Sequence, residues 1–528
     1  MKNTHKYPCL LLAALTLLVG VACGQSPKMQ PGAWGDQGDG TYKNPVLNAD
    51  YSDPDVIRVG SDFYLVCSDF HFMGIPVLHS KDLVNWTIIG QVYNRLDIDP
   101  GYSNMAKYSR GSWAPSLRYH DHKFYIYFCT PEEGLYMSTA TDPAGKWSLL
   151  TEVQRVPKWE DPCPFWDDDG QAYLGHSHTG AGPIIIHKMS ADGTKLLDTG
   201  TVVYRGPTSE GTKIYKRNGY YYIIIPEGGV GKGYETALRS KSIYGPYERK
   251  VVLEQGSTKV NGPHQGGWVE LDAGESWFMH FQDDGAIGRV CHLEPVHWVE
   301  DWPLMGVDID GNGIGEPVSV YKKPNVGGQY PISAPQTSDE FNGTKLGLQW
   351  QWNHNPVDGK WSLVQPKGYL SLQAMKAPNN KLAKNTISQK LMGKKGVMTT
   401  SLDLMQIADG QRAGLALLGQ NIYEIGVIDT NGKNMLFANN NGKVTLGPAL
   451  KQGVIYLRLS ADLDNEHTVM QYSLNGKDFE QLGDVCVLSK KNYWKGVRPG
   501  LFSYNVKEDG GVALFDWFRY SYDGPGGR

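Results

Sequence analysis

The sequence lacks the features that mark several large classes of protein. Outside the leader described below, five cysteines remain, an odd number at scattered positions, so neither a disulfide framework nor a zinc-ligand spacing is present. The formal net charge is −4 and charges of both signs are interspersed, which excludes the basic stripe of a nucleic-acid-binding protein. Few segments have helical periodicity. The remaining cysteines are expected to be buried apolar residues: Cys67, Cys129, Cys163, Cys291 and Cys486.

A targeting segment is expected in the first 23 residues. Lys2 and Lys6 precede a mostly apolar run at residues 10–21, and these twelve residues are too few to span a bilayer. A basic start followed by a short apolar run is typical of an export signal. The protein is therefore expected to be exported, to the periplasm or to the outer membrane of a Gram-negative bacterium.

The end of this segment resembles a lipoprotein cleavage site. Cys23 follows small residues, which predicts acylation of its thiol and attachment to a membrane. Ordinary signal-peptidase cleavage is the alternative, because Gly20 stands where lipoprotein sites usually have a larger apolar residue. Residues 24–41 are rich in Gly, Gln, Pro and Ser and are expected to form a flexible tether.

A β-hairpin is predicted at residues 207–229. Residues 212–216 and 220–225 form two strand-like runs, and Asn218-Gly219 between them is a turn pair that tolerates positive φ. Glu210 stands just before the first run. The 63 glycines and 30 prolines of the chain also favour an all-β protein rich in turns.

The same layout of one residue, a strand, a turn and a second strand occurs five times. The anchor residues lie 60, 48, 49 and 54 positions apart, and the turn follows each anchor by seven or eight positions. These anchors are Asp53, Trp113, Asp161, Glu210 and His264. A repeat of about 50 residues built from hairpins predicts a five-bladed β-propeller, here over residues 42–323, with all anchors at one end of the central channel. A β-sandwich with ordinary turn acids is the alternative.

Other segments complete the predicted domain order. Residues 42–47 are expected to add a strand to the last blade, 324–338 to be a linker, and 339–528 to form a concanavalin-like β-sandwich of jelly-roll type. The sandwich is expected to be structural or to bind sugar. Residues 308–317 superficially resemble a calcium loop, but Ser319 replaces the expected Glu. We expect a glycine-rich turn there, no metal site and no required cofactor; a structural calcium is the alternative.

The anchors predict hydrolysis of a glycosidic bond. This reaction needs a protonated acid for the leaving oxygen and a carboxylate base for water. Burial and a neighbouring negative charge keep a carboxyl protonated, so a third carboxylate is useful for tuning the acid. Asp53, Asp161 and Glu210 provide such a set at one register of successive repeats.

At these motifs the sequence resembles glycoside hydrolase family 43, five-bladed propeller enzymes that act on arabinose- and xylose-containing plant polysaccharides. The resemblance covers nearly everything after the tether, including a C-terminal sandwich that begins near Asp339. The matching segments are residues 44–47 with 52–55, 79–86, 113–117, 160–162 and 209–211.

The resemblance implies roles for individual residues. Asp53 would be the general base, Glu210 the general acid, and Asp161 the group that tunes and orients Glu210. The family inverts the anomeric centre, which implies a separation of roughly 6.5–9.5 Å between base and acid. The resemblance also implies four substrate-binding residues: Phe72, Trp113, His264 and Arg289.

The expected function is removal of non-reducing-end α-L-arabinofuranosyl residues from hemicellulose such as arabinoxylan or xyloglucan. An exo-β-D-xylosidase needs the same carboxylates and is the nearest alternative. A non-catalytic glycan-binding lipoprotein is a third possibility, and a retaining fructan hydrolase is disfavoured because its Asn-Asp-Pro-Asn opening is absent. His71 and Asp55 depart from residues common among relatives, close to the site. In each reading the partner is a plant oligosaccharide or polysaccharide.

Overall fold

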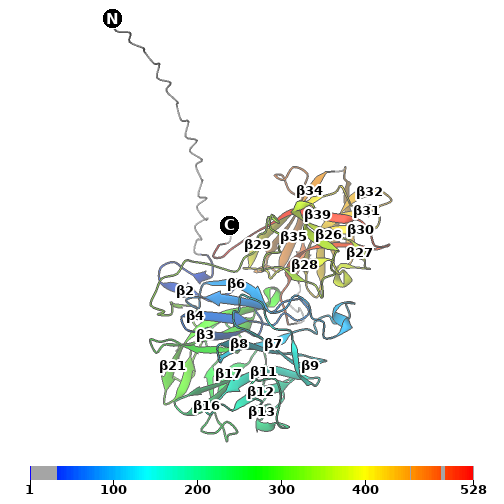
Figure 1. The fold of residues 1–528 in the computed structure, drawn as a ribbon. Helices are drawn as coiled ribbons and strands as arrows, with labels where there is room; N and C mark the ends of the chain where they lie inside the picture. The colour runs from blue at the N-terminus through cyan, green and yellow to red at the C-terminus, as the bar shows by residue number, and fades with distance from the viewer. Residues whose placement is uncertain (2–31, 452, 489–493, 527–528) are drawn as a thin grey trace.

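The computed structural model describes Met1 and residues 32–451, 453–488 and 494–526. In those ranges the regular structure is β-strand apart from short 3-10 helices at Pro100–Tyr102, Gly285–Ile287 and Asn380–Leu382. Figure 1 shows two bodies, a lower one in blue to green and an upper one in yellow to red. Apart from Met1, the predicted export signal with Cys23 and the first part of the predicted tether, residues 24–31, lie outside the described residues. Within the described part of the chain, no helix has the length and apolar character needed to cross a membrane.

Five four-stranded antiparallel sheets follow one another in the lower body, as the repeat predicts. Blade 1 contains β3 (Asp55–Val59), β4 (Asp62–Val66), β5 (Pro76–Ser80) and β6 (Trp86–Gln91). Blade 2 contains β7 (Trp113–His120), β8 (Lys123–Thr130), β9 (Gly134–Ala140) and β10 (Thr151–Arg155). Blade 3 contains β11 (Trp159–Trp166), β12 (Ala172–His178), β13 (Ile184–Met189) and β14 (Thr201–Tyr204). Blade 4 contains β15 (Lys213–Arg217), β16 (Tyr220–Glu227), β17 (Tyr234–Ser240) and β18 (Glu248–Leu253). Blade 5 contains β19 (His264–Glu270), β20 (Ser276–Asp283), β21 (Arg289–Val299) and β22 (Trp302–Met305).

The first strands of the blades form the innermost ring. β19 contacts β3, β3 contacts β7, β7 contacts β11, and β11 contacts β15. The predicted Asn218-Gly219 turn is present, with φ of 51° and 72°, and it pairs Arg217 with Tyr220. Both faces of a blade are covered by its neighbours, which explains the unbroken apolar run in β16. Ile223 and Ile225 pack toward blade 3, and Tyr222 and Ile224 pack toward blade 5.

The N-terminal segment meets the expectation only in part. β2 (Thr41–Lys43) pairs with β1 (Gly35–Asp36) and β23 (Val320–Lys322) in a separate three-stranded sheet, whereas Leu47 exchanges two backbone hydrogen bonds with Cys291 of β21 in blade 5. The predicted tether is also too long, because the chain is packed from Trp34, which is 2% exposed and stacks on Tyr522. Burial of the large Trp34 side chain is favourable and outweighs the entropy lost when this segment is ordered. The composition of the segment alone does not reveal this.

The upper body is a sandwich of two eight-stranded sheets, as the sequence predicts. One contains β24 (Gln351–Trp352), β28 (Thr386–Ser388), β38 (Arg498–Asn505), β30 (Gln411–Leu418), β31 (Ile422–Thr430), β32 (Lys433–Asn440) and β33 (Lys443–Ala449), with β27 (Met375–Lys376) beside β38. The other contains β25 (Trp361–Val364), β26 (Lys367–Gln373), β39 (Val512–Tyr522), β29 (Lys395–Asp403), β34 (Val454–Asp462), β35 (His467–Ser473) and β36 (Glu480–Gln481), with β37 (Cys486–Val487) beside β35. Cysteines of the described residues are free and buried, as expected.

A buried ionic contact joins the two bodies. Asp69, in the loop after β4, is completely buried, and its Oδ1 lies 2.9 Å from Lys390 Nζ and 3.6 Å from Arg498 Nη1. Lys390 and Arg498 belong to the sandwich and are themselves buried. One apolar core also continues from blade 1 into the sandwich. The loop that follows blade 1's second strand is therefore held by the second domain.

Replacing Asp69 by Ala is expected to destabilise the protein by about 3–5 kcal/mol, because it leaves two buried cations without their shared anion. Urea unfolding followed by tryptophan fluorescence measures the change. Asp484→Ala is the matched control, since its 2.7 Å ion pair with Lys443 is solvent-exposed and its loss should leave unfolding unchanged. A loss below 1 kcal/mol for Asp69→Ala would contradict the importance of this contact.

Candidate active site

The backbone bends at the start of each innermost strand. One residue there has φ in the left-handed region: Asp53 (54°), Ala114 (40°), Asp161 (55°), Gly211 (65°) and Gln265 (43°). In blades 2, 3 and 5 the hydrogen-bond register also shifts at this point. Such bulges redirect side chains, and a non-glycine residue in this region costs on the order of 1–3 kcal/mol. The anchors predicted from the repeat therefore lie at one bent rim of the ring.

Asp53 is held in place at this rim by two hydrogen-bond donors. Ser68 Oγ donates to Asp53 Oδ2 at 2.5 Å, and Arg289 Nη1 donates to Asp53 Oδ1 at 2.7 Å. Ser68 in turn accepts from the backbone N–H of Ala114 at 2.6 Å, so blades 1 and 2 jointly orient Asp53. Arg289 comes from blade 5. The predicted base and the predicted arginine are thus in direct contact.

Asp161 is buried and receives three hydrogen bonds. Gly211 N–H donates to Oδ2 at 2.6 Å, Ser177 Oγ to Oδ2 at 3.1 Å, and Gln265 Nε2 to Oδ1 at 3.0 Å. Burial, followed by the charge of Glu210, raises the pKa of Asp161 to about 6. Because Gly211 directly follows Glu210, the first of these bonds also fixes the backbone that carries Glu210. This contact fits the predicted orienting role of Asp161.

Glu210 is the most open of the three predicted carboxylates, with 24% of its side chain exposed. His264 Nε2 lies 3.1 Å from Glu210 Oε1. Burial acts to raise the pKa of Glu210, but the hydrogen bond and charge of His264, with the charge of Arg289, outweigh it and lower the pKa. His264 itself is 2% exposed, so it lies behind Glu210 rather than on an open wall of the pocket.

The two predicted aromatic residues lie in different places. Trp113 is half-buried, and its ring meets those of Phe70 and Trp494 edge to face, with centroids 6.0 and 5.2 Å apart. Phe72 is 2% exposed and is covered by the guanidinium of Arg498 at 4.0 Å. The structure therefore places Phe72 at the contact between the two bodies, where its ring is not open to a sugar.

Two further residues at the site were missed from the sequence. Glu160 precedes Asp161, and strand alternation would point it away from the channel, but the bend at Asp161 turns both inward. Trp494 comes from the sandwich, which the propeller repeat does not cover, and its carbonyl accepts from Ser52 Oγ at 3.3 Å. The adjacent Lys495 is 4% exposed, with its Nζ 3.1 Å from His71 Nδ1 and 3.0 Å from Ser109 Oγ.

Three of the carboxylates at this rim form a close cluster. One carboxylate oxygen each of Glu160, Asp161 and Glu210 lies within 4.8 Å of the other two. N–H and O–H donors already occupy both oxygens of Asp161, and His264 occupies Oε1 of Glu210. In the loop at residues 308–317, Asp308 accepts from the backbone N–H groups of Gly311 and Gly313 at 2.7 and 3.0 Å. Its carboxylate thus stabilises a turn.

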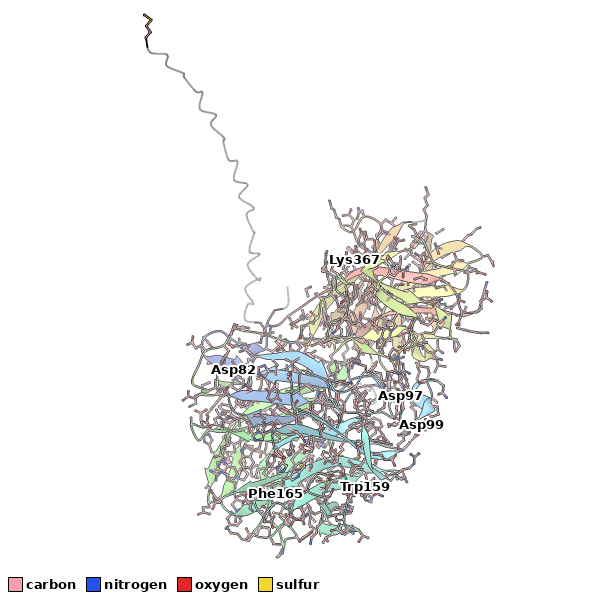
Figure 2. All side chains as sticks on the ribbon, viewed as in Figure 1. Asp82, Asp97, Asp99, Trp159, Phe165 and Lys367 are labelled. Atoms are coloured by element: carbon pink, nitrogen blue, oxygen red, sulfur yellow. The ribbon has the colours of Figure 1, made fainter. Side chains whose placement is uncertain are left out.

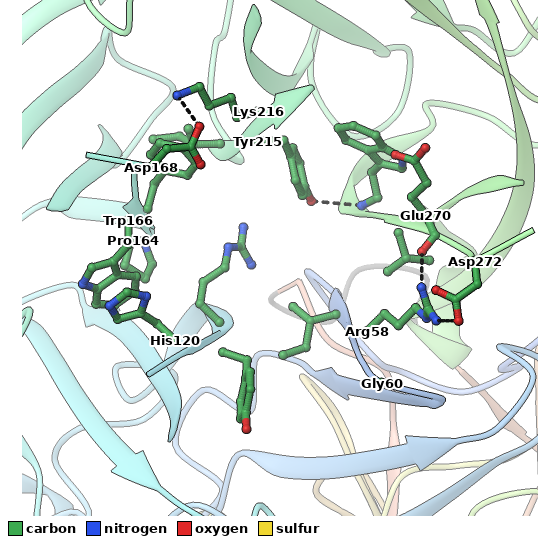
Figure 3. Close-up of a pocket in the computed structure, with 17 residues that line it drawn as sticks. Arg58, Gly60, His120, Pro164, Trp166, Asp168, Tyr215, Lys216, Glu270 and Asp272 are labelled. Atoms are coloured by element: carbon green, nitrogen blue, oxygen red, sulfur yellow. Dashed lines mark hydrogen bonds and ion pairs between the residues drawn. The ribbon is translucent and has the colours of Figure 1, made fainter. Parts of the chain in front are cut away.

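A cavity of about 680 Å³ lies at the other end of the channel. Figure 3 shows its wall, formed where the first hairpins turn, with Arg58 paired to Asp272 at 2.5 Å and Lys216 to Asp168 at 2.9 Å. Figure 2 labels one residue near each end of β11. Trp159 directly precedes Glu160 and Asp161 in the sequence, and Phe165, near the other end of the strand, lines this cavity. Arg58 and Lys216 of this mouth are paired with Asp272 and Asp168, and the predicted catalytic carboxylates lie at the opposite rim.

Comparisons with known proteins agree with this arrangement. Residues 42–303 match the family described as "Glycosyl hydrolases family 43", and residues 338–521 match the "Beta xylosidase C-terminal Concanavalin A-like domain". The first covers the propeller and its carboxylates. The second covers the sandwich.

Curated relatives are similar along most of their length. A candidate β-xylosidase of Xylanibacter ruminicola is 51% identical over 88% of this chain and 87% of its own. A β-xylosidase of Formosa agariphila is 39% identical over 98% of both chains. A non-reducing end α-L-arabinofuranosidase of Bacteroides ovatus is 31% identical over 91% of this chain and 94% of its own.

A solved structure shares the architecture. It is a bifunctional GH43-CE protein of Bacteroides eggerthii, 30% identical with a TM-score of 0.82, covering 94% of this chain and 64% of that protein. The matched families, the similar relatives and the shared architecture lead to one conclusion: the chain belongs to glycoside hydrolase family 43 and is a glycosidase.

Proposed function

We propose that the protein is an exo-acting, inverting glycosidase that releases single pentose units from xylan- or arabinoxylan-type oligosaccharides. The observation that carries the proposal is that the two carboxylates are held separately. Asp53 is hydrogen-bonded by Arg289 and Ser68. Glu210 lies at the start of a different strand, where Asp161 accepts from the backbone N–H of the next residue, Gly211. Base and acid are thus held by different blades around one channel. The small exposed fractions of Asp53 and Asp161, 6% and 4%, favour a pocket for one terminal sugar.

In the proposed reaction, Asp53 accepts a proton from a water molecule as its oxygen attacks the anomeric carbon. The bond between that carbon and the leaving oxygen breaks, and Glu210 gives its proton to the leaving oxygen. Arg289 and Ser68 hold Asp53 toward the water. Asp161 orients Glu210 through the N–H of Gly211. The proposed steps involve only side chains, one backbone N–H group and water, so the proposed reaction needs no cofactor.

We propose β-D-xylosyl ends as the preferred substrate and α-L-arabinofuranosyl ends as the second. This order reverses the one expected from the sequence motifs, because the relatives named β-xylosidase, at 51% and 39% identity, are more similar than the one named α-L-arabinofuranosidase, at 31%. Both sugars are pentoses, and the same three carboxylates can hydrolyse either glycoside. Arabinofuranosidase activity is therefore the second candidate function. The predicted export and lipidation of Cys23 would place either activity outside the cytoplasm.

The first test is hydrolysis of 4-nitrophenyl β-D-xyloside and α-L-arabinofuranoside by the purified protein, with the product anomer followed by NMR. We expect turnover of the xyloside at the higher kcat/KM and inversion at the anomeric carbon. Faster turnover of the arabinofuranoside would reverse the order of substrates. Net retention would rule out the mechanism, and glycan binding without turnover of oligosaccharides would favour the binding-protein alternative.

Glu210→Gln tests the acid. Removal of a general acid lowers the rate by about 10²–10⁴-fold, and the loss is smaller for good leaving groups that need little protonation. We therefore expect a large loss of kcat with unsubstituted xylobiose and a smaller one with the 4-nitrophenyl glycoside. Glu270→Gln, at the opposite mouth of the same channel, is the control and should retain activity. Equal rates for Glu210→Gln and wild type would remove Glu210 from the mechanism.

Trp494→Ala tests the contribution of the sandwich to the pocket. An aromatic contact of this kind is worth about 0.5–1.5 kcal/mol, so we expect KM to rise roughly 2- to 13-fold while kcat changes little. Trp517→Ala is the matched control, because its ring contacts Tyr456 within the sandwich. An unchanged KM for Trp494→Ala would show that substrate does not reach this wall.

A further inference from the structure

Glu160 is a buried carboxyl at the site, and none of the steps above uses it. It lies in β11 directly before Asp161 and is 6% exposed. One of its oxygens lies within 4.8 Å of an oxygen of Asp161 and of an oxygen of Glu210, and this close cluster does not include Asp53. Glu160 therefore lines the pocket on the side of the proposed acid.

Most of the hydrogen-bonding capacity of Glu160 is unused. The backbone N–H of Ala181 donates to Glu160 Oε1 at 3.4 Å, which is long for a hydrogen bond, and it is the one hydrogen bond between this side chain and the described residues. Asp161, the next residue, accepts three hydrogen bonds at 2.6–3.1 Å. A buried polar group with few partners is unfavourable unless a ligand or water supplies them. The carboxyl of Glu160 is thus available to a molecule that enters the pocket.

The charges around Glu160 favour an uncharged partner. Burial, followed by the charges of Asp161 and Glu210, raises the pKa of Glu160 to about 9, so its carboxyl is neutral at pH 7. A neutral carboxyl has one O–H donor and a carbonyl oxygen that accepts. An anionic group on the ligand would be repelled by the neighbouring carboxylates. A hydroxyl group, which both donates and accepts, matches Glu160 without adding charge.

The depth of Glu160 indicates the terminal sugar rather than the leaving group as its partner. Glu160 and Asp161 are 6% and 4% exposed, whereas 24% of the Glu210 side chain is exposed. In a pocket that holds one terminal sugar, the leaving group extends toward the opening, next to the acid that protonates it. The more deeply buried Glu160 then lies beside the sugar inside the pocket.

We propose that Glu160 is a substrate-binding residue whose carboxyl hydrogen-bonds a hydroxyl group of the terminal pentose. This inference rests on the proposed function, in which the pocket holds one terminal pentose. Glu160 takes no part in proton transfer. Its contribution is to hold the sugar between Asp53 and Glu210, and the sugar in turn supplies the hydrogen bonds that the protein does not provide.

The first test compares kcat/KM of Glu160→Leu and Glu160→Gln with that of wild type. Leu has a similar volume but forms no side-chain hydrogen bonds, whereas Gln keeps a donor and an acceptor. The unpaired sugar hydroxyl should lower kcat/KM of the Leu variant about 5- to 150-fold. The Gln variant should lose less than about fivefold. Equal losses in both variants would show that Glu160 acts through its proton or charge, which contradicts the proposal.

The loss should not depend on the leaving group. Xylobiose and 4-nitrophenyl β-D-xyloside place the same sugar in the pocket, so Glu160→Leu should lower kcat/KM for both by a similar factor. Glu210→Gln should differ, because the loss of an acid is larger with xylobiose. A Glu160→Leu loss confined to xylobiose would place Glu160 at the leaving sugar or in the acid step, and the proposal would be wrong.

Monodeoxy analogues test the contact itself. They are the 4-nitrophenyl β-D-xylosides that lack the hydroxyl at carbon 2, 3 or 4. At least one of them should be a poor substrate for wild type and should lose nothing further in Glu160→Leu, because both changes remove the same hydrogen bond. The remaining analogues should show the full loss. A full loss with all three would mean that Glu160 binds none of these hydroxyls.

Two readouts need no activity. Isothermal titration calorimetry with xylose, in the Glu210→Gln background, should give a higher Kd when Glu160→Leu is added. The melting temperature of Glu160→Leu should equal or exceed that of wild type, because the variant removes a buried carboxyl that has few partners in the protein.

Glu424→Leu is the matched control. Glu424 lies in β31 of the sandwich, is 1% exposed, and accepts a hydrogen bond from Asn439 Nδ2 at 2.6 Å. Its replacement leaves a buried amide without its partner, so it should lower the melting temperature. Xylose binding and kcat/KM should stay unchanged, which separates a contact with substrate from burial alone.

A structural role for Glu160 predicts the reverse pattern, a lower melting temperature with unchanged kcat/KM and xylose binding, and this result would overturn the proposal. If Glu160→Leu does not fold, Glu160→Ala replaces it in every comparison. If neither variant folds, Glu160 is structural and the proposal is wrong.

Failure of this inference and failure of the proposed function are distinguishable. If wild type turns over neither glycoside, the proposed function is wrong, and the effect of Glu160→Leu on xylose binding still decides the role of Glu160. If wild type is active and Glu160→Leu matches it in kcat/KM, only the contact of Glu160 with the sugar is refuted.

Discussion

The site depends on a backbone bend that is repeated at the entrance to each innermost strand. In a regular strand, adjacent side chains point to opposite faces, so Glu160 and Asp161 could not share one pocket. The left-handed φ of Asp161 and the register shift beside it remove this alternation. Strain of this kind persists where the surrounding structure over-determines it. The ring of five sheets provides that constraint, and the bent backbone in turn holds the carboxylates in one pocket.

Hydrogen-bond donors then decide which buried acid is charged. Burial of a carboxylate is unfavourable unless donors or cations compensate. Asp161 receives three donors and has a pKa of about 6, whereas Glu160 receives one long hydrogen bond and has a pKa of about 9. Glu210, beside His264, has a lowered pKa. The protonation order of the cluster therefore depends on the donors and cations beside each carboxyl rather than on burial alone.

Much of this arrangement could be predicted from sequence, because the propeller repeat leaves a periodic trace. Spacing alone brought Asp53, Asp161 and Glu210 together, and the two-residue turn at Asn218-Gly219 has local chemistry that tertiary structure does not override. Trp494 could not be predicted in this way. It belongs to the sandwich, which has no repeat, and its position at the site depends on how the sandwich packs against the propeller. Glu160 lies in a segment that matches the family, but the repeat does not mark it as a site residue. Regular strand alternation would place it on the face opposite Asp161, and this alternation does not hold at the bent entrance of the strand.

Two errors have the same origin. Phe72 is close in sequence to Phe70, which contacts Trp113, and residues 34–41 have the composition of a tether. Phe72 nevertheless packs against Arg498, and Trp34 against Tyr522, both far away in sequence. Local patterns carry no information about such partners. The cost of leaving a large ring exposed is what selects the buried arrangement.

The seam between the two domains has a consequence for any exchange of the sandwich. Asp69 ties the sandwich to the loop of blade 1, and the sandwich places Trp494 against Trp113 at the rim of the pocket. Exchange of the sandwich for a different one would therefore remove the buried partners of Asp69 and also change the aromatic surroundings of Trp113. The propeller and the sandwich thus form one structural unit at the rim of the pocket.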